Sequence, residues 1–381
     1  MRVALIAESF LPQTNGVVHS VLRVLEHLHA RGDEALVIAP ADPVGVPMIM
    51  SGAPVITVPS LPLPIYPEVR IAGGPAAPVA SLLRDFRPDV MHLASPFMLG
   101  WRGVLAAQAV GLPTVAVYQT DVPGLAVRSG FRLGERLLWR RIRDLHSRAT
   151  LTLAPSSASV TALEAQGVER IRLWRRGVDS RRFRPDRRDH ELRRRLAPNG
   201  EKLIGFVGRL AAEKQLDDLA VLRDLPGCRL VIIGDGPERR RLATVLPEAI
   251  FTGMLHGDDL ARAVSGLDVL VTPGESETFC QVVQEAMASG VPVVAPAAGG
   301  PLDLIDHSRT GWLYPPGELL TMRDRVRDLV GDDAKREAFG RAARASVLHR
   351  GWRPVCTELV GYYAEAADLH AASLRRSAHR R

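Results

Sequence analysis

The strongest constraint on the fold is that short apolar runs alternate with helical patterns along the whole chain. Each run has the length of one strand and is rich in Val, Ile and Leu, as in strands buried on both faces of a parallel sheet. Such alternation indicates an α/β protein, with two doubly wound, Rossmann-like domains facing a central cleft. The predicted strands are residues 2–7, 34–39, 54–58, 89–93, 113–118, 150–154, 203–207, 229–233, 249–252, 268–272, 292–295 and 312–314. The predicted helices are residues 16–31, 75–86, 99–110, 133–147, 157–166, 215–224, 236–245, 257–265, 279–289, 301–306 and 319–330.

The domain boundaries follow from this pattern and from the length of 381 residues, which suffices for two domains. We place an N-terminal domain at residues 1–174, a polar linker region at 175–199 and a C-terminal domain at 200–351. A further helical pattern at 352–374 is expected to pack back on the first domain. Open parallel sheets bind ligands outside the carboxyl ends of their strands, so the cleft is the candidate site.

The charge distribution favours anionic partners. The formal net charge is +7, and the Arg excess concentrates at residues 128–148, 170–195 and 375–381. Lipid headgroups, nucleic acid and phosphorylated substrates are the anions such patches attract. A GC-rich genome also raises the Arg content and would account for about half of this excess.

The cysteines and the apolar runs indicate the cellular compartment of the protein. The three cysteines, Cys228, Cys280 and Cys356, are widely separated, which argues for a reducing environment and against a disulfide framework or a Cys-pair metal site. No apolar run approaches the ~18–20 residues that span a bilayer, and the N-terminal run is too short for a signal peptide. We therefore expect a cytoplasmic protein.

Two acidic residues mark the segment 274–290, where an apolar run leads into an amphipathic helix. Glu277 and Glu285 are eight residues apart, just over two helical turns. If the helix begins near Phe279, Glu277 lies in the loop and Glu285 lies inside the helix. The free N–H groups between them favour an anion, so a phosphate flanked by hydroxyl acceptors fits, as in a sugar nucleotide. Taken alone, the pair is equally well explained by a first-turn acid favoured by the helix dipole and an exposed helix residue.

Two cations follow the first strand of the second half. Arg209 comes directly after the strand, and Lys214 stands at the next helix start. Arg binds a diphosphate bidentately and Lys adds a point charge, so the two suit a diphosphate. The alternative is an ordinary solvated loop.

Further candidates lie at other strand ends. Gly16 stands at a helix start, where backbone can approach a phosphate closely, although a helix cap is the commoner explanation. Gln119 and Asp121 follow a buried strand and are candidates for holding sugar hydroxyls or the acceptor; Asp121 is equally a turn or cap residue. The turns at 233–237 and 251–256, the second containing Met254, are candidates for a base pocket, but tight packing turns look the same and are favoured.

A basic amphipathic helix is predicted from Arg128 to Arg143. It can lie on an anionic membrane, or it can be a surface helix whose apolar face is core, which is the commoner case. The apolar face holds Phe131, Leu138, Ile142 and Leu145, and the basic face holds Arg132, Arg136, Arg140 and Arg143.

In order and spacing, the Gly16 loop, the Arg209/Lys214 pair and the Glu277/Glu285 pair resemble glycosyltransferase family 4, the retaining nucleotide-sugar transferases of GT-B fold. The segments 7–13, 118–124 and 274–285 look like the actinobacterial GDP-mannose-dependent α-mannosyltransferases. Those enzymes build mannosylated glycolipids and lipomannan on phosphatidylinositol mannoside or glucuronosyl diacylglycerol acceptors. The resemblance implies transfer of mannose from GDP-mannose to such a lipid-linked acceptor, without metal or other cofactor.

The resemblance also implies roles for residues. Gly16 would approach the donor phosphate through its backbone, Arg209 and Lys214 would neutralise the leaving diphosphate, and Glu285 would bind the ribose. Glu277 would hold the transferred sugar together with the amides from Phe279 to Val282. The implied catalytic set is Arg209, Lys214, Glu277 and Asp121; the donor-binding set is Gly16, Gln119, Arg209, Lys214, Met254, Glu277, Thr278, Phe279, Cys280, Gln281, Val282 and Glu285.

Position 119 departs from the family pattern. Many family members carry His there, whereas Gln cannot shuttle a proton, so Gln119 can only hydrogen-bond the sugar. The implied reaction is front-face transfer, in which the acceptor hydroxyl attacks from the side that the diphosphate leaves and the phosphate takes the proton.

Several alternatives remain open. The same fold can use a UDP-sugar on a diacylglycerol or a soluble acceptor. A sugar-nucleotide epimerase and a nucleic-acid-binding protein are less favoured, the second because no nucleic-acid motif accompanies the basic residues. A nicotinamide dehydrogenase is disfavoured because the glycine fingerprint is missing. We expect a cytoplasmic enzyme that binds the inner face of the plasma membrane peripherally and does not bind nucleic acid.

Overall fold

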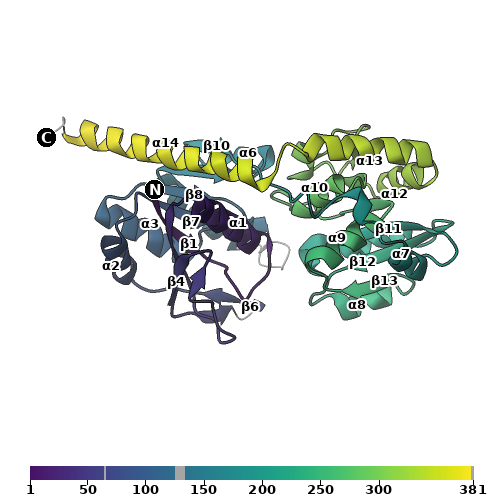
Figure 1. Ribbon diagram of the computed structural model, residues 1–381, viewed down its shortest axis with the longest axis horizontal. Coiled ribbons are helices and arrows are strands. Elements are labelled where there is room, and N and C mark those ends of the chain that lie inside the picture. Colours follow the sequence, from purple (N-terminus) through teal and green to yellow (C-terminus); the bar gives the residue numbers. More distant parts are fainter. Residues whose placement is uncertain (64–65, 125–133, 379–381) are drawn as a thin grey trace. The chain divides into compact units, whose positions relative to one another are not determined.

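The computed structural model of the protein describes residues 1–63, 66–124 and 134–378 (Figure 1). The chain divides into two compact units. Of the described residues, unit 1 comprises Met1–Pro123, Gly134–Arg176 and those from Arg353 onward, and unit 2 comprises Gly124 and Gly177–Trp352. Each unit contains one large, mainly parallel sheet, so the predicted α/β class with two doubly wound sheets is confirmed.

Unit 1 is built on an eight-stranded sheet of order β10-β9-β8-β7-β1-β2-β4-β3. All neighbours are parallel except the short edge strand β3, which is antiparallel to β4. The central strands are buried apolar runs because helices cover both faces of the sheet. Its strands are β1 Arg2–Ala7, β2 Glu34–Pro40, β3 Ile49–Met50, β4 Ala53–Val58, β7 Val90–Ala94, β8 Thr114–Val117, β9 Leu151–Ala154 and β10 Ile171–Leu173; β5 Leu61–Leu63 and β6 Tyr66–Ile71 form a separate antiparallel pair.

The helices of unit 1 bury one face each. The buried positions of α1 recur at helical spacing, as in Val17, Val21, Val24 and Leu28. The long C-terminal helix α14 is held to the sheet by two buried polar contacts: Trp174 Nε1 donates to Val355 O at 3.0 Å, and His92 Nδ1 lies 2.6 Å from Tyr363 Oη. The helices are α1 Gly16–Ala30, α2 Ala77–Phe86, α3 Leu99–Val110, α5 Glu135–Arg148, α6 Ser157–Ala165 and α14 Trp352–Ala378.

Unit 2 is built on a six-stranded parallel sheet of order β13-β12-β11-β14-β15-β16. The chain order reverses between β11 and β14, so the loops that follow these neighbouring strands leave the same edge of the sheet side by side. Its strands are β11 Lys202–Val207, β12 Cys228–Ile233, β13 Ile250–Gly253, β14 Val269–Val271, β15 Val293–Pro296 and β16 Gly311–Tyr314. Its α-helices are α7 His190–Leu196, α8 Arg239–Val245, α9 Gly257–Gly266, α10 Gln281–Ala288, α11 Pro301–Leu304, α12 Leu319–Val330 and α13 Asp333–Val347; Pro185–Arg187, Ala212–Lys214 and Leu216–Leu222 are 3-10 helices.

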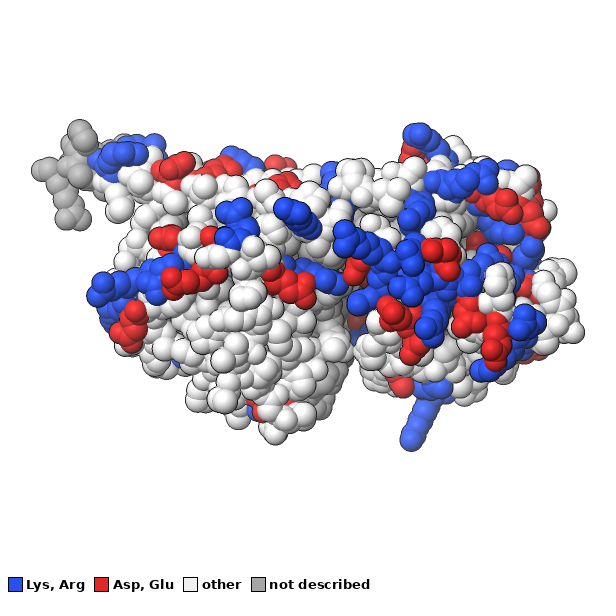
Figure 2. All heavy atoms as spheres, viewed as in Figure 1, with Lys and Arg blue, Asp and Glu red and all other residues white. Residues whose placement is uncertain are grey.

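Residues 177–195, the part of the Arg-rich segment 170–195 that belongs to unit 2, place exposed and half-buried arginines on the surface of that unit. Figure 2 shows Lys and Arg side chains gathered there, over α9 and its surroundings. Several of these cations pair with nearby acids, as Arg182 does with Asp258 at 3.4 Å and Arg184 with Asp186 at 3.1 Å. Much of the local positive charge is therefore balanced within the unit.

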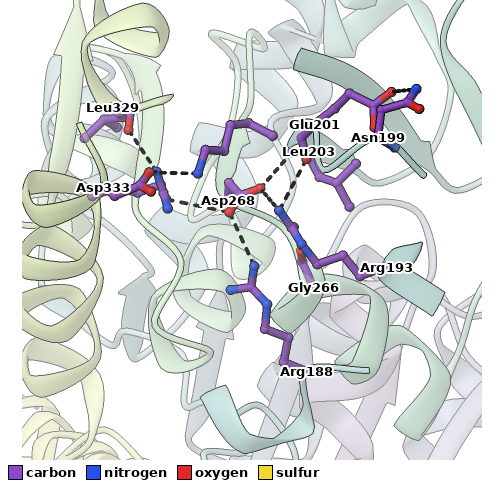
Figure 3. Close-up of polar contacts among 11 residues, drawn as sticks. Arg188, Arg193, Asn199, Glu201, Leu203, Gly266, Asp268, Leu329 and Asp333 are labelled. Atoms are coloured by element: carbon purple, nitrogen blue, oxygen red, sulfur yellow. Dashed lines mark hydrogen bonds and ion pairs between the residues drawn. The ribbon is translucent and has the colours of Figure 1, made fainter. Parts of the chain in front are cut away.

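A buried carboxylate ties part of this segment to the sheet at the amino ends of the strands (Figure 3). Asp268, which precedes β14, has a side chain only 1% exposed and accepts from Leu203 N at 2.8 Å. Its carboxylate also meets Arg193 at 2.7 Å, Arg188 at 3.4 Å and Arg336 at 3.6 Å. This charged cluster is structural, because it lies at the end of the sheet opposite to the loops that follow the strands.

Some predicted elements begin or end at other residues than expected, and some elements of the structure were not predicted. The helix expected to begin near Phe279 begins at Gln281, and the helix expected at 215–224 is a 3-10 helix, Leu216–Leu222, that follows Gln215 at a φ of +51°. Helix α7 was missed because it spans only seven residues and has only two apolar side chains, Leu192 and Leu196, too few to stand out as a helical pattern. The short strands β3, β5, β6 and β10 and the helix α13 were also missed. Among the described residues, no helix has the length and apolar character needed to cross a membrane.

Candidate functional site

In unit 2, the loops that follow β11 and β14 touch each other. A Cβ at Gly274 would lie 3.4 Å from the Cα of Lys214, and Glu275 N donates to Gln215 Oε1 at 2.9 Å. The two loops therefore form one surface at the carboxyl edge of the sheet, as the strand order requires. This surface brings together three predicted site residues: Arg209, Lys214 and Glu277.

An ion pair lies at the centre of this surface. Lys214 Nζ lies 2.5 Å from Glu277 Oε1, with side chains 23% and 17% exposed. Burial alone would lower the pKa of Lys214, but the adjacent Glu277 carboxylate outweighs burial and raises that pKa above its ordinary value. Lys214 is thus a permanent cation, and the sequence did not predict that the two residues would pair.

Arg209 belongs to the same loop as Lys214, and glycine contacts hold this loop. Its Nη2 lies 3.5 Å from Glu213 Oε1. A Cβ at Gly234 would lie 1.9 Å from Gly208 O, and a Cβ at Gly236 would lie 2.4 Å from Leu210 O. The glycine turn after β12 therefore supports the Arg209 loop by close backbone packing, the explanation favoured from the sequence.

The loop that carries Glu277 is supported in the same way by two glycines that the sequence analysis missed. Gly300 N donates to Glu277 O at 2.7 Å. A Cβ at Gly299 would lie 2.3 Å from Glu277 O, and a Cβ at Gly300 would lie 2.2 Å from Phe279 O. Their signal in the sequence is a Gly-Gly-Pro run that begins three residues after the end of the strand β15.

The start of α10 has an unusual backbone. Cys280 precedes the helix at a φ of +67°, a left-handed conformation that costs a non-glycine residue about 1–2 kcal/mol. Such strain persists where the surrounding structure enforces it, often at functional sites. Burial raises the pKa of the Cys280 thiol, so the side chain is a neutral packing group.

Glu285 lies in α10, where the residue is partly buried. Burial raises its pKa to about 8; Arg182 opposes this rise and Asp179 adds to it. Nearby, Gln281 Nε2 donates to Gly177 O at 3.0 Å. As predicted, Glu277 lies in the loop before the helix and Glu285 lies within it.

Met254 does not join this group. It follows β13, the edge strand of the sheet, and its side chain is 49% exposed. Two strands, β12 and β11, separate β13 from β14. Thr278, Phe279 and Val282 lie next to Glu277 and Gln281 along the chain, with Phe279 fully buried.

In unit 1, Gly16 lies at the start of α1. The guanidinium of Arg176 lies where a side chain at position 16 would otherwise extend. A Cβ at Gly16 would lie 2.3 Å from Arg176 Nη1. Arg176 Nη2 donates to Gln119 Oε1 at 2.7 Å, and the two residues are only 6% and 5% exposed. Because a guanidinium only donates, the amide oxygen of Gln119 faces Arg176, and its NH₂ group points another way. Arg176 was not predicted; its only sequence signal is a basic pair before Gly177.

Two neighbouring features complete this part of unit 1. Tyr118 Oη donates to Asp121 Oδ1 at 3.1 Å, and burial, followed by the Asp121 charge, raises the pKa of Tyr118. The carboxylate of Glu8 accepts from four consecutive N–H groups, 97 to 100, at 2.9–3.0 Å. The N-terminus of α3 is therefore occupied by the protein's own acid.

The basic helix is described only from residue 134 onward, since 125–133 lie outside the described residues. Ile142 and Leu145 of α5 are buried, so this part of its apolar face is core. Arg141 stacks over the ring of Trp101 at 3.9 Å. These contacts agree with the commoner of the two explanations, a surface helix whose apolar face is core.

Two family models match the chain: "Glycosyltransferase Family 4" over residues 14–182 and "Glycosyl transferases group 1" over residues 188–346. A GDP-mannose-dependent α-mannosyltransferase of Mycobacterium tuberculosis is 51% identical, over 95% of this chain and 96% of that protein. The chain belongs to glycosyltransferase family 4. A GDP-mannose-dependent α-mannosyltransferase of Corynebacterium glutamicum is 44% identical over 97% and 90% of the two chains.

More distant proteins share the architecture. An α-monoglucosyldiacylglycerol synthase of Streptococcus pneumoniae is 24% identical over 82% of this chain and 75% of that protein. The crystal structure of Anabaena HepE with UDP and glucose superposes with a TM-score of 0.77 at 21% identity, covering 95% of this chain and 99% of that chain. This likeness shows the GT-B fold. The described residues contain no group of three or more His, Cys, Asp or Glu side chains placed to hold a metal ion, and metal-independent chemistry remains a prediction.

Proposed function

We propose that this glycosyltransferase transfers mannose from GDP-mannose to a lipid-linked acceptor with retention of configuration. The Lys214–Glu277 ion pair carries the proposal, because, with Arg209 on the same loop as Lys214, it offers two cations and one hydroxyl acceptor at the strand ends. The names of the relatives at 51% and 44% identity support GDP-mannose as the donor.

In this proposal the chain acts by positioning the donor and stabilising charge. The acceptor oxygen forms a bond to C1 of mannose while the bond from C1 to the diphosphate oxygen breaks. The acceptor proton passes to that phosphate oxygen, on the same face of the sugar. Arg209 and Lys214 stabilise the negative charge that develops on the diphosphate, the role that a metal ion has in other transferases.

The other residues have binding roles. Glu277 holds mannose hydroxyls together with the amides around Cys280, and Glu285 accepts from the ribose hydroxyls. From unit 1, the Gly16 backbone contacts phosphate, and Gln119 and Asp121 contact the sugar or the acceptor. Met254 is proposed to contact the base.

A lipid acceptor is supported by the diacylglycerol in the name of the Streptococcus pneumoniae relative. Phosphatidylinositol mannoside and glucuronosyl diacylglycerol are the proposed acceptor types. The enzyme would then work in the cytoplasm, on the inner face of the plasma membrane.

Calorimetric titration with GDP and with UDP tests the donor first. We expect clear preference for GDP, followed by mannose transfer from GDP-mannose to lipid acceptors in the presence of EDTA. Preference for UDP would keep the site but replace the donor, and activity lost to EDTA would contradict metal-independent transfer. Failure of a folded sample to bind either nucleotide would refute the proposal.

A further inference from the structure

One long segment of unit 1 carries no charge. Residues 43–67 contain no Asp, Glu, Lys, Arg or His, although charged residues make up 24% of the chain. The described part of this segment includes β3, β4 and β5. In Figure 2 the surface of unit 1 around β4 and β6 is accordingly almost entirely white.

The segment also exposes large apolar side chains. Val44 and Met48 are each 83% exposed, Leu61 is 75% exposed and Ile49 is 67% exposed. Ser60 Oγ donates to Ala41 O, which brings Leu61 next to the stretch that leads to Val44. Single exposed apolar residues are ordinary, but a group of them on an uncharged surface marks an interaction site. We call these four residues the apolar surface.

The backbone of the segment indicates what kind of partner it fits. β3 is the edge strand of the large sheet, and exposed edges usually carry charge or proline to prevent pairing with another chain. Here there is no charge, but there are seven prolines in residues 43–67, at positions 43, 47, 54, 59, 62, 64 and 67. Proline has no N–H, so a strand from another chain finds no hydrogen-bond donor there to pair with. For the same reason, proline leaves no backbone donor unsatisfied in an apolar medium.

We propose that the apolar surface inserts into the boundary between headgroups and acyl chains of the lipid layer that contains the acceptor. This inference rests on the proposed lipid acceptor. An uncharged, proline-rich surface with protruding Val, Met, Ile and Leu suits that depth, whereas charges would be costly there. Arg70, on the strand that pairs with β5, lies at its margin with its guanidinium on Ser60, where a cation can reach headgroup phosphates.

This surface differs from the basic helix that the sequence singled out. In the described part of α5, Ile142 and Leu145 lie in the core, and Arg140 and Arg143 pair with Asp144 at 3.9 and 3.3 Å. Binding through the basic helix would need anionic lipid and would weaken with salt. Binding through the apolar surface would persist on neutral lipid and in high salt.

Co-sedimentation of the full chain with neutral phosphatidylcholine vesicles, at low and high salt, tests the proposal. The test variant is Met48→Ser/Leu61→Ser. The control is Leu320→Ser, because Leu320 is 74% exposed, like Leu61, but lies in unit 2. We expect the wild type and the control to bind in both salts, and the test variant to bind at least tenfold more weakly.

Two further measurements separate the explanations. GDP affinity and transfer to a detergent-solubilised acceptor should be unchanged in the test variant, while transfer to the same acceptor in vesicles should fall. Vesicle binding that is equal in the test variant and the wild type, or that needs anionic lipid and vanishes in salt, would overturn the inference. So would a wild-type dimer that Met48→Ser/Leu61→Ser converts to a monomer. If wild-type protein binds neutral vesicles but binds neither GDP nor UDP, the proposed function is refuted, whereas the inference that the apolar surface binds lipid is supported.

Discussion

Replacing Lys214 by Met should separate the stability of the site from its catalytic power. The change removes the cation and leaves the Glu277 carboxylate, which is 17% exposed, without its 2.5 Å partner. Removing one member of a buried pair costs about 3–5 kcal/mol; because both side chains keep some contact with water, we expect about 2–3 kcal/mol. For a unit of this size that corresponds to a Tm lower by roughly 4–10 °C.

The double variant Lys214→Met/Glu277→Gln tests this reasoning. Neutralising both partners removes the uncompensated charge, so most of the lost stability should return. Turnover should not return, because the cation that stabilises the leaving diphosphate is still absent. We expect turnover at least tenfold below wild type in both variants, equivalent to about 1.4 kcal/mol of barrier.

The assays are thermal unfolding of the ligand-free protein and initial rates at saturating GDP-mannose. Lys202→Met is the matched control, because Lys202 pairs with the 63%-exposed Asp333 at 2.7 Å. It should cost under about 1 kcal/mol and leave turnover unchanged. Wild-type turnover in Lys214→Met, or in the double variant, would remove Lys214 from the catalytic machinery.

Three further predictions concern titration and hydrogen-bond direction. The pKa of Glu285 is raised to about 8, and ribose hydroxyls donate best to a carboxylate, so GDP affinity should rise between pH 6.5 and 8.5, by up to about tenfold per pH unit below the pKa. Glu285→Gln should flatten this rise. If calorimetry gives the variant and the wild type the same dependence of GDP affinity on pH, the assignment of Glu285 to the ribose is contradicted. Gln119→Glu keeps the acceptor that Arg176 binds but removes the NH₂ donors, so kcat/KM should fall at least tenfold without loss of Tm, and full activity would show that the amide donors are not used. Burial lowers the pKa values of His92 and His146 to about 3 in the folded protein. Between about pH 6.5 and pH 3 these residues therefore take up protons in the unfolded chain but not in the folded one. Each residue should then lower the free energy of unfolding by roughly 1.4 kcal/mol for every unit by which the pH falls. Urea unfolding at pH 7 and 5.5 should show a shallower loss in His92→Gln, and an unchanged slope would refute that pKa.

The sequence predicted the sheets well because their strands are buried on both faces and read as continuous apolar runs. β1 and β14 are examples: almost every residue in them is buried. The missed elements lack such a signal. α7 has seven residues with only two partly buried leucines, Leu192 and Leu196, and β3 has only two residues, Ile49 and Met50.

The candidate site was predictable where residues directly follow strands. Lys214 and Glu277 meet because β11 and β14 are neighbours, a consequence of strand order, and Arg209 belongs to the loop that carries Lys214. Arg176 was not predictable, because its contact with Gln119 joins residues 57 positions apart and depends on the absence of a side chain at Gly16.

The contact of Gly299 and Gly300 with the Glu277 loop constrains how this enzyme can be adapted to another sugar. Main chain lies against main chain there, at distances that leave no space for a methyl group. The path of the Glu277 loop on that side is therefore set by the packing of main chain against main chain, and a side chain at either glycine would displace it. A library that seeks a new donor should therefore keep both glycines.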